Sequence, residues 1–239
     1  MVVLVHGAWH GGWCWAALQA ELDRRGVPSL APDLPGHGAS VEPLGDLYGD
    51  ADAIAALVRR LDRSVVLVGH SYGGMVITQV AAQVDQVTEL VFVAAFVPDH
   101  DESLMGLLGG FEQRRVALGL ATRPGPTEGT TSVDPTGAVA AFYDLAPPEV
   151  AAAAVARLGL QPLATFTQPV TGAAWRTLPS TYVRCSHDEA IHPDHQAIMA
   201  ARCATAVTLD ADHSPFLTHV ADLADLIETA WRQAKGVTS

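Results

Sequence analysis

The chain has few cysteines, few basic residues and no long hydrophobic run. Its three cysteines, Cys14, Cys185 and Cys203, are odd in number and unrelated in position, so we expect neither a disulfide framework nor a Cys-x-x-Cys metal site. With 14 basic and 26 acidic residues, the formal net charge is −12, which disfavours nucleic acid and anionic membranes as partners. No apolar run approaches the length of a membrane span.

Signals for export and for phosphate binding are also missing. The chain opens on the strand-like run Met1 to Val5, without the basic segment and cleavage site of a signal peptide, so we expect a cytoplasmic protein. The glycine patterns G-x-x-x-x-G-K-[ST] and G-x-G-x-x-G are absent. We therefore expect no cofactor, and a small neutral substrate suits this composition better than a charged one.

Apolar runs alternate with stretches of helical periodicity along most of the 239 residues. The predicted strands are 2–5, 28–31, 65–68, 90–97, 180–185 and 204–209. The predicted helices lie between and after them, at about 13–25, 47–61, 75–84, 195–202 and 216–233. This alternation predicts an α/β fold with a mostly parallel, doubly wound sheet.

The alternation stops between Pro98 and about Pro179, where the sequence is helical in character but irregular. A stretch of roughly eighty residues is too long for a loop within an α/β domain. We therefore expect a helical cap at 98–179, inserted into a core made of 1–97 and 180–239. The last residues, from Gly236 onward, are expected to be disordered.

The stretch from Val65 to Val76 contains the most informative motif. Four apolar residues are followed by Gly69-His70-Ser71-Tyr72-Gly73-Gly74, and helical spacing begins directly afterwards. A G-x-S-x-G pattern between a strand and a helix is typical of the nucleophile elbow, which lifts a serine Oγ clear of the sheet. A purely structural glycine-rich turn is the alternative, and the flanking elements and downstream partners favour catalysis.

A serine becomes a nucleophile when an imidazole accepts its proton, and a carboxylate must fix the tautomer of that imidazole. In this fold class the three groups follow in the order Ser, Asp, His. Asp188 follows the predicted strand 180–185, and His213 follows the last predicted strand. Because ligands bind at the carboxyl ends of such strands, we predict a catalytic triad of Ser71, Asp188 and His213.

Neighbouring acidic residues and histidines admit other interpretations. Asp210 and Asp212 are too close to His213 in sequence to reach its ring, so we expect them on the surface or in a turn. No helix carries two of the nearby histidines at i and i+4, so we predict no metal site in the cluster His187, Asp188, His192, Asp194 and His195. His195 is expected to be solvated or in a first helical turn, and His37 and His70 to bond the backbone.

A tetrahedral intermediate needs two preorganised donors for its oxyanion. The backbone N–H of Tyr72, which follows the serine, is one candidate. The second should come from the loop after the first strand, and we predict the N–H of Ala8. The Tyr72 side chain is expected either to line the pocket or to pack against the cap.

Six segments carry a family resemblance: His-Gly-Ala-Trp-His-Gly-Gly-Trp-Cys-Trp (6–15), Asp-Leu-Pro-Gly-His-Gly (33–38), Gly-His-Ser-Tyr-Gly-Gly (69–74), Phe-Val-Pro-Asp (96–99), Asp-x-x-Ile-x-Pro (188–193) and Ala-Asp-His (211–213). They resemble the α/β-hydrolase family, within it the branch of salicylate-binding-type methylesterases, hydroxynitrile lyases and bacterial EstC-like esterases. The similarity extends from the first residue to about Leu226 and is weakest in the cap. It implies the same triad and the same oxyanion donors.

The resemblance also bears on the choice of reaction. Lyases of this branch carry a threonine after the histidine of the first strand and a lysine after the triad histidine, which receives the cyanide charge. Gly7 and Ser214 stand at these positions, so the resemblance implies ester hydrolysis over cyanohydrin cleavage. Ser71 likewise disfavours the dehalogenase and epoxide-hydrolase branches, which use an aspartate.

The sequence thus predicts a serine hydrolase that cleaves small carboxylic esters through an acyl-enzyme. Lactone or carbon–carbon bond hydrolysis, hydroxynitrile lyase-like activity and a non-catalytic small-molecule receptor remain as alternatives. The expected substrate is a small neutral ester, for which an aromatic group is one option, and a homodimer is compatible with the sequence. The candidate pocket residues are the aromatics Trp9, Phe111, Phe142, Phe166 and Trp175.

Overall fold

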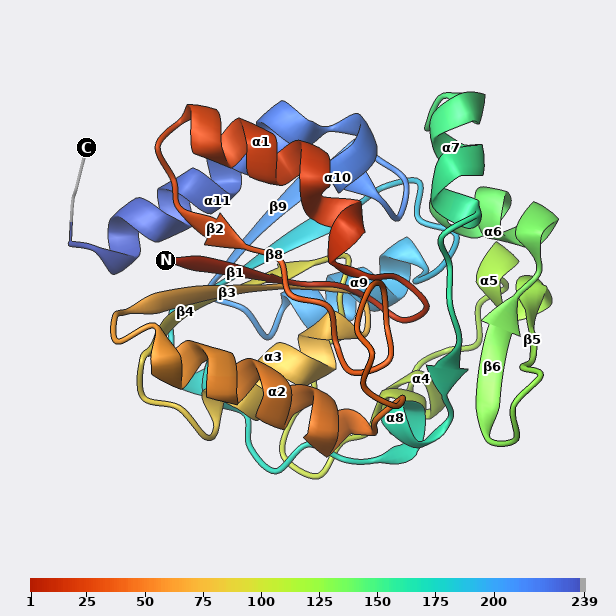
Figure 1. The fold of residues 1–239 in the computed structure, drawn as a ribbon, viewed down its shortest axis with the longest axis horizontal. Coiled ribbons are helices and arrows are strands. Elements are labelled where there is room, and N and C mark those ends of the chain that lie inside the picture. Colours follow the sequence, from red (N-terminus) through yellow and green to blue (C-terminus); the bar gives the residue numbers. More distant parts are fainter. Residues whose placement is uncertain (237–239) are drawn as a thin grey trace.

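The computed structural model describes residues 1–236 and contains a six-stranded sheet with helices on both faces (Figure 1). Its strands are β1 (Val2–Val5), β2 (Ser29–Leu30), β3 (Val65–His70), β4 (Val87–Val93), β8 (Ser180–Cys185) and β9 (Thr205–Leu209). The spatial order is β2-β1-β3-β4-β8-β9, and all neighbouring pairs are parallel. The predicted α/β fold with a doubly wound parallel sheet is confirmed.

Six helices accompany this sheet: α1 (Ala16–Arg24), α2 (Leu47–Arg60), α3 (Gly73–Ala81), α9 (Pro193–Ala200), α10 (Pro215–Thr218) and α11 (Val220–Ala234). Side chains of the central strands alternate between two hydrophobic clusters. Val3 and Leu67 pack in the cluster with α2 and α3, whereas Leu4 and Val68 pack in the cluster with α1 and α11. Because both faces are covered, these strands are apolar without interruption.

Among the differences from the predicted element ends, two have a visible backbone cause. The strand expected at 90–97 begins at Val87 and ends at Val93, because Ala94 has a φ of 42° and breaks the extended conformation. Residues 95–97 are buried outside any strand, so their apolar character reflects burial alone. The closing helix expected at 216–233 is divided into α10 and α11 at His219, which has φ −123° and ψ 44°.

Between β4 and β8 the chain forms an insertion of short helices and a second, small sheet. The helices are α4 (Leu104–Gly110), α5 (Ala117–Ala121), α6 (Pro135–Phe142), α7 (Pro148–Val155) and α8 (Ala164–Thr167). The antiparallel strands are β5 (Thr122–Pro124), β6 (Thr130–Val133) and β7 (Gln161–Pro162). The helical insertion is confirmed. The small sheet is not predictable from the sequence, because its short strands lack alternation and two of them contain proline.

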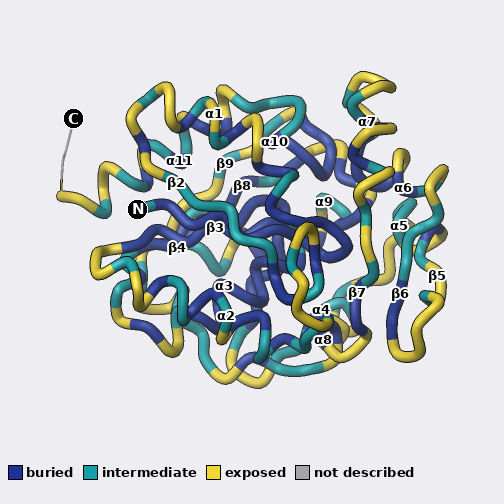
Figure 2. Tube along the Cα trace, viewed as in Figure 1, coloured by how far each residue is buried: buried dark blue, intermediate teal, exposed yellow. Residues whose placement is uncertain are grey.

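Figure 1 places the insertion at one end of the large sheet, on the side of its carboxyl ends, with the N-terminus at the other end. Figure 2 shows the central strands buried, whereas much of β5 and α7 is exposed. No helix within residues 1–236 is long and apolar enough to cross a membrane. Of the tail expected to be disordered, residues 237–239 lie outside the described residues.

Candidate active site

The turn between β3 and α3 holds Ser71 in an unfavourable backbone conformation. Its φ is 53°, in the left-handed region that residues with a side chain seldom adopt. The Ser71 N–H donates to the carbonyl of Val93 (3.2 Å), and its own carbonyl accepts from the N–H groups of Gly74 (3.0 Å) and Phe96 (3.1 Å). These three bonds hold the strained turn in place, as is common where strain serves a site.

The two glycines of G-x-S-x-G are required by close backbone contacts. A Cβ atom at Gly69 would lie 2.6 Å from the carbonyl oxygen of Gly73, and one at Gly73 would lie 2.6 Å from that of Val5. Both distances are too short for any side chain. The motif therefore marks a real geometric restriction at this turn.

His213 and Asp188 form a buried pair in the loops that follow β9 and β8. His213 Nδ1 lies 2.7 Å from Asp188 Oδ2, and the two residues are 1% and 2% exposed. Asp188 Oδ1 accepts from the N–H groups of Ala190 (2.7 Å) and Ile191 (2.8 Å), and Oδ2 accepts from Gln196 Nε2 (2.8 Å). This carboxylate is fixed by four bonds, so it selects the Nδ1–H tautomer and leaves His213 Nε2 free to accept a proton.

His70 brings the serine turn and the His213 loop together. Its Nε2–H donates to the carbonyl of His213 (2.8 Å), and the two ring centroids are 4.5 Å apart. Burial lowers the pKa of His70 well below its usual value, so the ring is neutral. Within the described residues, Ser71 Oγ and His213 Nε2 form no hydrogen bond. In ligand-free active sites this contact is commonly long and shortens in the reacting complex.

Two buried backbone N–H groups, those of Ala8 and Tyr72, are free beside Ser71. Both residues line the same cavity as Ser71 and are 4% and 1% exposed. In the part of the chain that the structure describes, neither N–H has a hydrogen-bond acceptor. Buried backbone donors are almost always paired, so these two are available for an oxygen atom of a ligand.

A cavity of about 430 Å³ lies over Ser71, between the carboxyl ends of the strands and the insertion. This volume falls in the usual range for small-molecule sites. Its wall is mainly apolar and includes Leu104, Leu108, Leu118, Phe166 and Ile191. Arg114 also lines it, but its guanidinium is paired with Glu112 (2.8 Å) and Asp194 (3.0 Å). The cavity therefore suits an uncharged ligand.

The structure corrects the predicted set of pocket aromatics. Trp9 and Phe166 line the cavity, whereas Phe111, Phe142 and Trp175 do not. Phe142 is 1% exposed and packs within the core, with its ring centroid 5.6 Å from that of His213. The sequence identifies aromatic residues in the insertion but not the direction in which each side chain points.

The other two aromatics serve packing elsewhere. Trp175 donates its indole N–H to the Pro98 carbonyl (2.7 Å), and Phe111 packs against His195, with ring centroids 5.0 Å apart. His195 itself is in the first turn of α9, as expected, but it is buried and lines the cavity.

The acidic residues and histidines weighed as alternatives have other contacts. Across residues 1–236, no group of three or more histidine, cysteine, aspartate and glutamate side chains could hold a metal ion. Asp210 is exposed, as expected, and pairs with His187 (2.7 Å). Asp212 differs from the expectation of a surface or turn position: it is buried in the loop before His213 and accepts from the N–H groups of Leu145 and Ser214. His37 Nδ1 lies 3.0 Å from the Pro35 carbonyl oxygen, the expected backbone contact.

The comparison with known families agrees with the fold. The sequence matches the Alpha/beta hydrolase family over residues 2–226, so the chain belongs to that family. Within it, the chain belongs to the branch of the plant methylesterases. It is 30% identical to salicylic acid-binding protein 2 of Nicotiana tabacum over 251 aligned positions, covering 95% of this chain and 96% of that protein.

Two further relatives are informative. The carbendazim hydrolyzing esterase of Nocardioides sp. (strain SG-4G) is 44% identical over 117 residues, which cover 44% of this chain and 46% of that protein. The crystal structure of a pyrethroid hydrolase from Sphingobium faniae JZ-2 superposes with a TM-score of 0.84 at 24% identity, covering 95% of each chain. This similarity shows that the two proteins share a fold. The family resemblance expected from the six sequence segments is confirmed.

Proposed function

We propose that this protein is a serine hydrolase that cleaves small uncharged carboxylic esters through an acyl-enzyme. One arrangement carries the proposal: a strained Ser71 faces an apolar cavity with two unpaired N–H groups, and His70 joins its turn to the buried His213–Asp188 pair. Relatives described as esterases and methylesterases support the same reaction class.

In the proposed reaction, Ser71 Oγ attacks the ester carbonyl carbon while its proton passes to His213 Nε2. The Asp188 carboxylate stabilises the resulting imidazolium through Nδ1–H. The N–H groups of Ala8 and Tyr72 bind the oxyanion, a contribution of several kcal/mol in related chemistry. Collapse breaks the bond to the alcohol, which leaves with the proton from His213.

Water then completes the cycle. His213 Nε2 takes a proton from a water molecule while the water oxygen attacks the acyl carbon. The second tetrahedral intermediate then breaks its bond to Ser71 Oγ, which receives the proton from His213 Nε2 as the carboxylic acid is released. Trp9 and Phe166 are proposed to contact the substrate. Ser214, which is fully buried, offers no ammonium group for a departing cyanide, and this favours ester hydrolysis over cyanohydrin cleavage.

The test uses p-nitrophenyl butyrate and a fluorophosphonate probe. Ser71→Ala should abolish labelling and lower kcat by a factor of at least about 10⁴, and Asp188→Asn should lower kcat by about 10³ to 10⁴. The matched control is Ser40→Ala, because Ser40 lies in a loop outside the cavity lining, and this variant should label normally.

Labelling that persists in Ser71→Ala would show that another group is the nucleophile. A panel of methyl, aryl and lactone esters that all remain intact, while a small ligand raises Tm, would instead indicate a receptor without turnover.

A further inference from the structure

The residue next to Ala8 is bound to the insertion through all of its polar groups. The Trp9 N–H donates to Gln161 Oε1 (3.1 Å), its carbonyl accepts from the N–H of Gly159 (2.7 Å), and its indole N–H donates to Thr131 Oγ1 (3.1 Å). Trp9 has a φ of 62°, which a large side chain rarely adopts. Contacts from the insertion therefore maintain a loop conformation that the local sequence does not favour.

Gln161 makes the central contact from strand β7 of the small sheet. A backbone N–H can only donate, so the amide group that faces Trp9 must be the carbonyl oxygen. The same oxygen lies 2.9 Å from His37 Nε2, and Gln161 Nε2 donates to Thr165 Oγ1 (2.9 Å). Gln161 is 0% exposed. The bond to Thr165 thus fixes the Gln161 amide, and its oxygen holds the Trp9 N–H.

The other end of the Ala8–Trp9 peptide is also held from the insertion. The carbonyl of Ala8 accepts from His10 Nδ1–H (2.8 Å), and His10 Nε2 accepts from the hydroxyl of Tyr143 (2.7 Å). Burial lowers the pKa of His10 to about 4, so the neutral ring donates through one nitrogen and accepts through the other. The peptide group is therefore bound at both its N–H and its oxygen.

We propose that Gln161 is a positioning residue for the oxyanion hole. By holding the Ala8–Trp9 peptide, together with Tyr143 acting through His10, it sets the direction of the free N–H of Ala8. This inference rests on the proposed function, and it makes the insertion part of the catalytic geometry as well as a wall of the cavity. An oxyanion donor acts only within about 2.7–3.1 Å of the developing charge, so a small shift of the loop is costly.

The decisive variant is Gln161→Met, which keeps a long unbranched side chain but removes both amide groups. We expect kcat for p-nitrophenyl butyrate to fall about 10- to 100-fold, with KM within about threefold of wild type. Affinity for a trifluoromethyl ketone, which forms a tetrahedral adduct on the serine, should fall by a similar factor.

Gln168→Met is the matched control. Gln168 also connects the insertion to the core, since its Oε1 accepts from the Leu47 N–H (2.8 Å) and its Nε2 donates to Asp46 Oδ2 (2.8 Å). It contacts the start of α2 and not the Ala8 loop. A merely structural role of such links would affect both glutamine variants alike, whereas positioning predicts a kcat within about twofold of wild type for Gln168→Met.

The outcomes separate this inference from the proposed function. If Ser71→Ala is inactive and Gln161→Met keeps the wild-type kcat, or changes only KM, the positioning role is wrong and the hydrolase assignment stands. If the wild-type protein has no Ser71-dependent turnover, both fall. Should Gln161→Met fail to fold, Tyr143→Phe probes the same peptide from its oxygen side, and an unchanged kcat in that variant would overturn the inference.

Discussion

Among single residues, the buried carboxyl group of Asp50 binds Tyr72, the residue that follows Ser71 in the turn. Asp50 lies in α2 with 0% exposure and accepts the Tyr72 hydroxyl at Oδ2 (2.7 Å). Its Oδ1 has no partner among residues 1–236. Burial raises the pKa of Asp50 to about 7, against the opposing effect of the Tyr72 hydrogen bond. The contribution of Asp50 to the free energy of unfolding therefore depends on pH.

We predict that Asp50→Asn changes the pH dependence of stability. The folded pKa lies above the unfolded value, so wild type has its full stability below about pH 4 and loses the Asp50 contribution as pH rises through about 7. Asparagine does not titrate. The free energy of unfolding of Asp50→Asn relative to wild type should therefore increase over this interval, by on the order of 3–4 kcal/mol. Urea unfolding at pH 4, 6 and 8 measures this difference, and a difference that does not change with pH would contradict the prediction.

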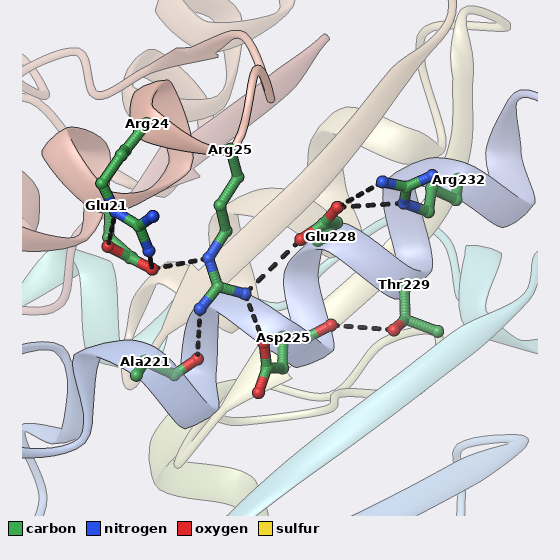
Figure 3. Close-up of polar contacts among 8 residues, drawn as sticks. All are labelled: Glu21, Arg24, Arg25, Ala221, Asp225, Glu228, Thr229 and Arg232. Carbon is green, nitrogen blue, oxygen red and sulfur yellow. Dashed lines mark hydrogen bonds and ion pairs between the residues drawn. The ribbon is translucent and has the colours of Figure 1, made fainter.

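At the scale of elements, one arginine joins the two helices that cover a face of the sheet. Figure 3 shows Arg25, which follows α1, directed at α11. Its guanidinium donates to Glu21 (2.6 Å) on its own helix, and to Asp225 and Glu228 (3.4 Å) on α11. The Arg25 side chain is 15% exposed, so solvent screens these contacts less than those of a fully exposed ion pair.

We predict that Arg25→Met lowers Tm by about 2–4 °C, because it keeps the apolar stem but removes the contacts between α1 and α11. The decrease should be smaller in 0.5 M NaCl. Arg24→Met is the matched control, since Arg24 is 71% exposed and, among the residues that the structure describes, its side chain binds only Glu21 of the same helix. Scanning calorimetry of the two variants tests this. Equal shifts in both would mean that the link between the helices contributes nothing.

The elements differ in how far the sequence pattern predicts them. The strands of the large sheet are predictable because burial on both faces makes them uniformly apolar. The three strands of the small sheet are not, since Gln161–Pro162 pairs with β6 through only two residues and carries no periodic signal. The break at His219 is equally invisible, because the apolar spacing continues across it.

The whole molecule has a formal net charge of −12, and its cavity has a mainly apolar wall. The guanidinium of Arg114 in that wall is already paired with two carboxylates, so it is not free to compensate an anionic ligand. An anion would lose hydration on entry and be repelled on approach.

We therefore predict a strong preference for neutral esters. The kcat/KM for p-nitrophenyl butyrate should exceed that for mono-p-nitrophenyl glutarate, which carries a free carboxylate, by at least about tenfold. Because the long-range repulsion is screened by salt, the ratio should decrease at 0.5 M NaCl. Steady-state kinetics on both esters measure it. Comparable rates at low salt would show that Arg114 is available to the substrate.

The α/β fold, the serine turn and the candidate positions of Asp188 and His213 are predictable from the sequence, because apolar runs, glycine spacing and element order are local properties. Packing in three dimensions places Trp9 and Phe166 in the cavity wall but not Phe142, and it brings Gln161 to a backbone N–H 152 residues away. Such contacts depend on how an irregular insertion packs and where each side chain points, and no local pattern encodes either.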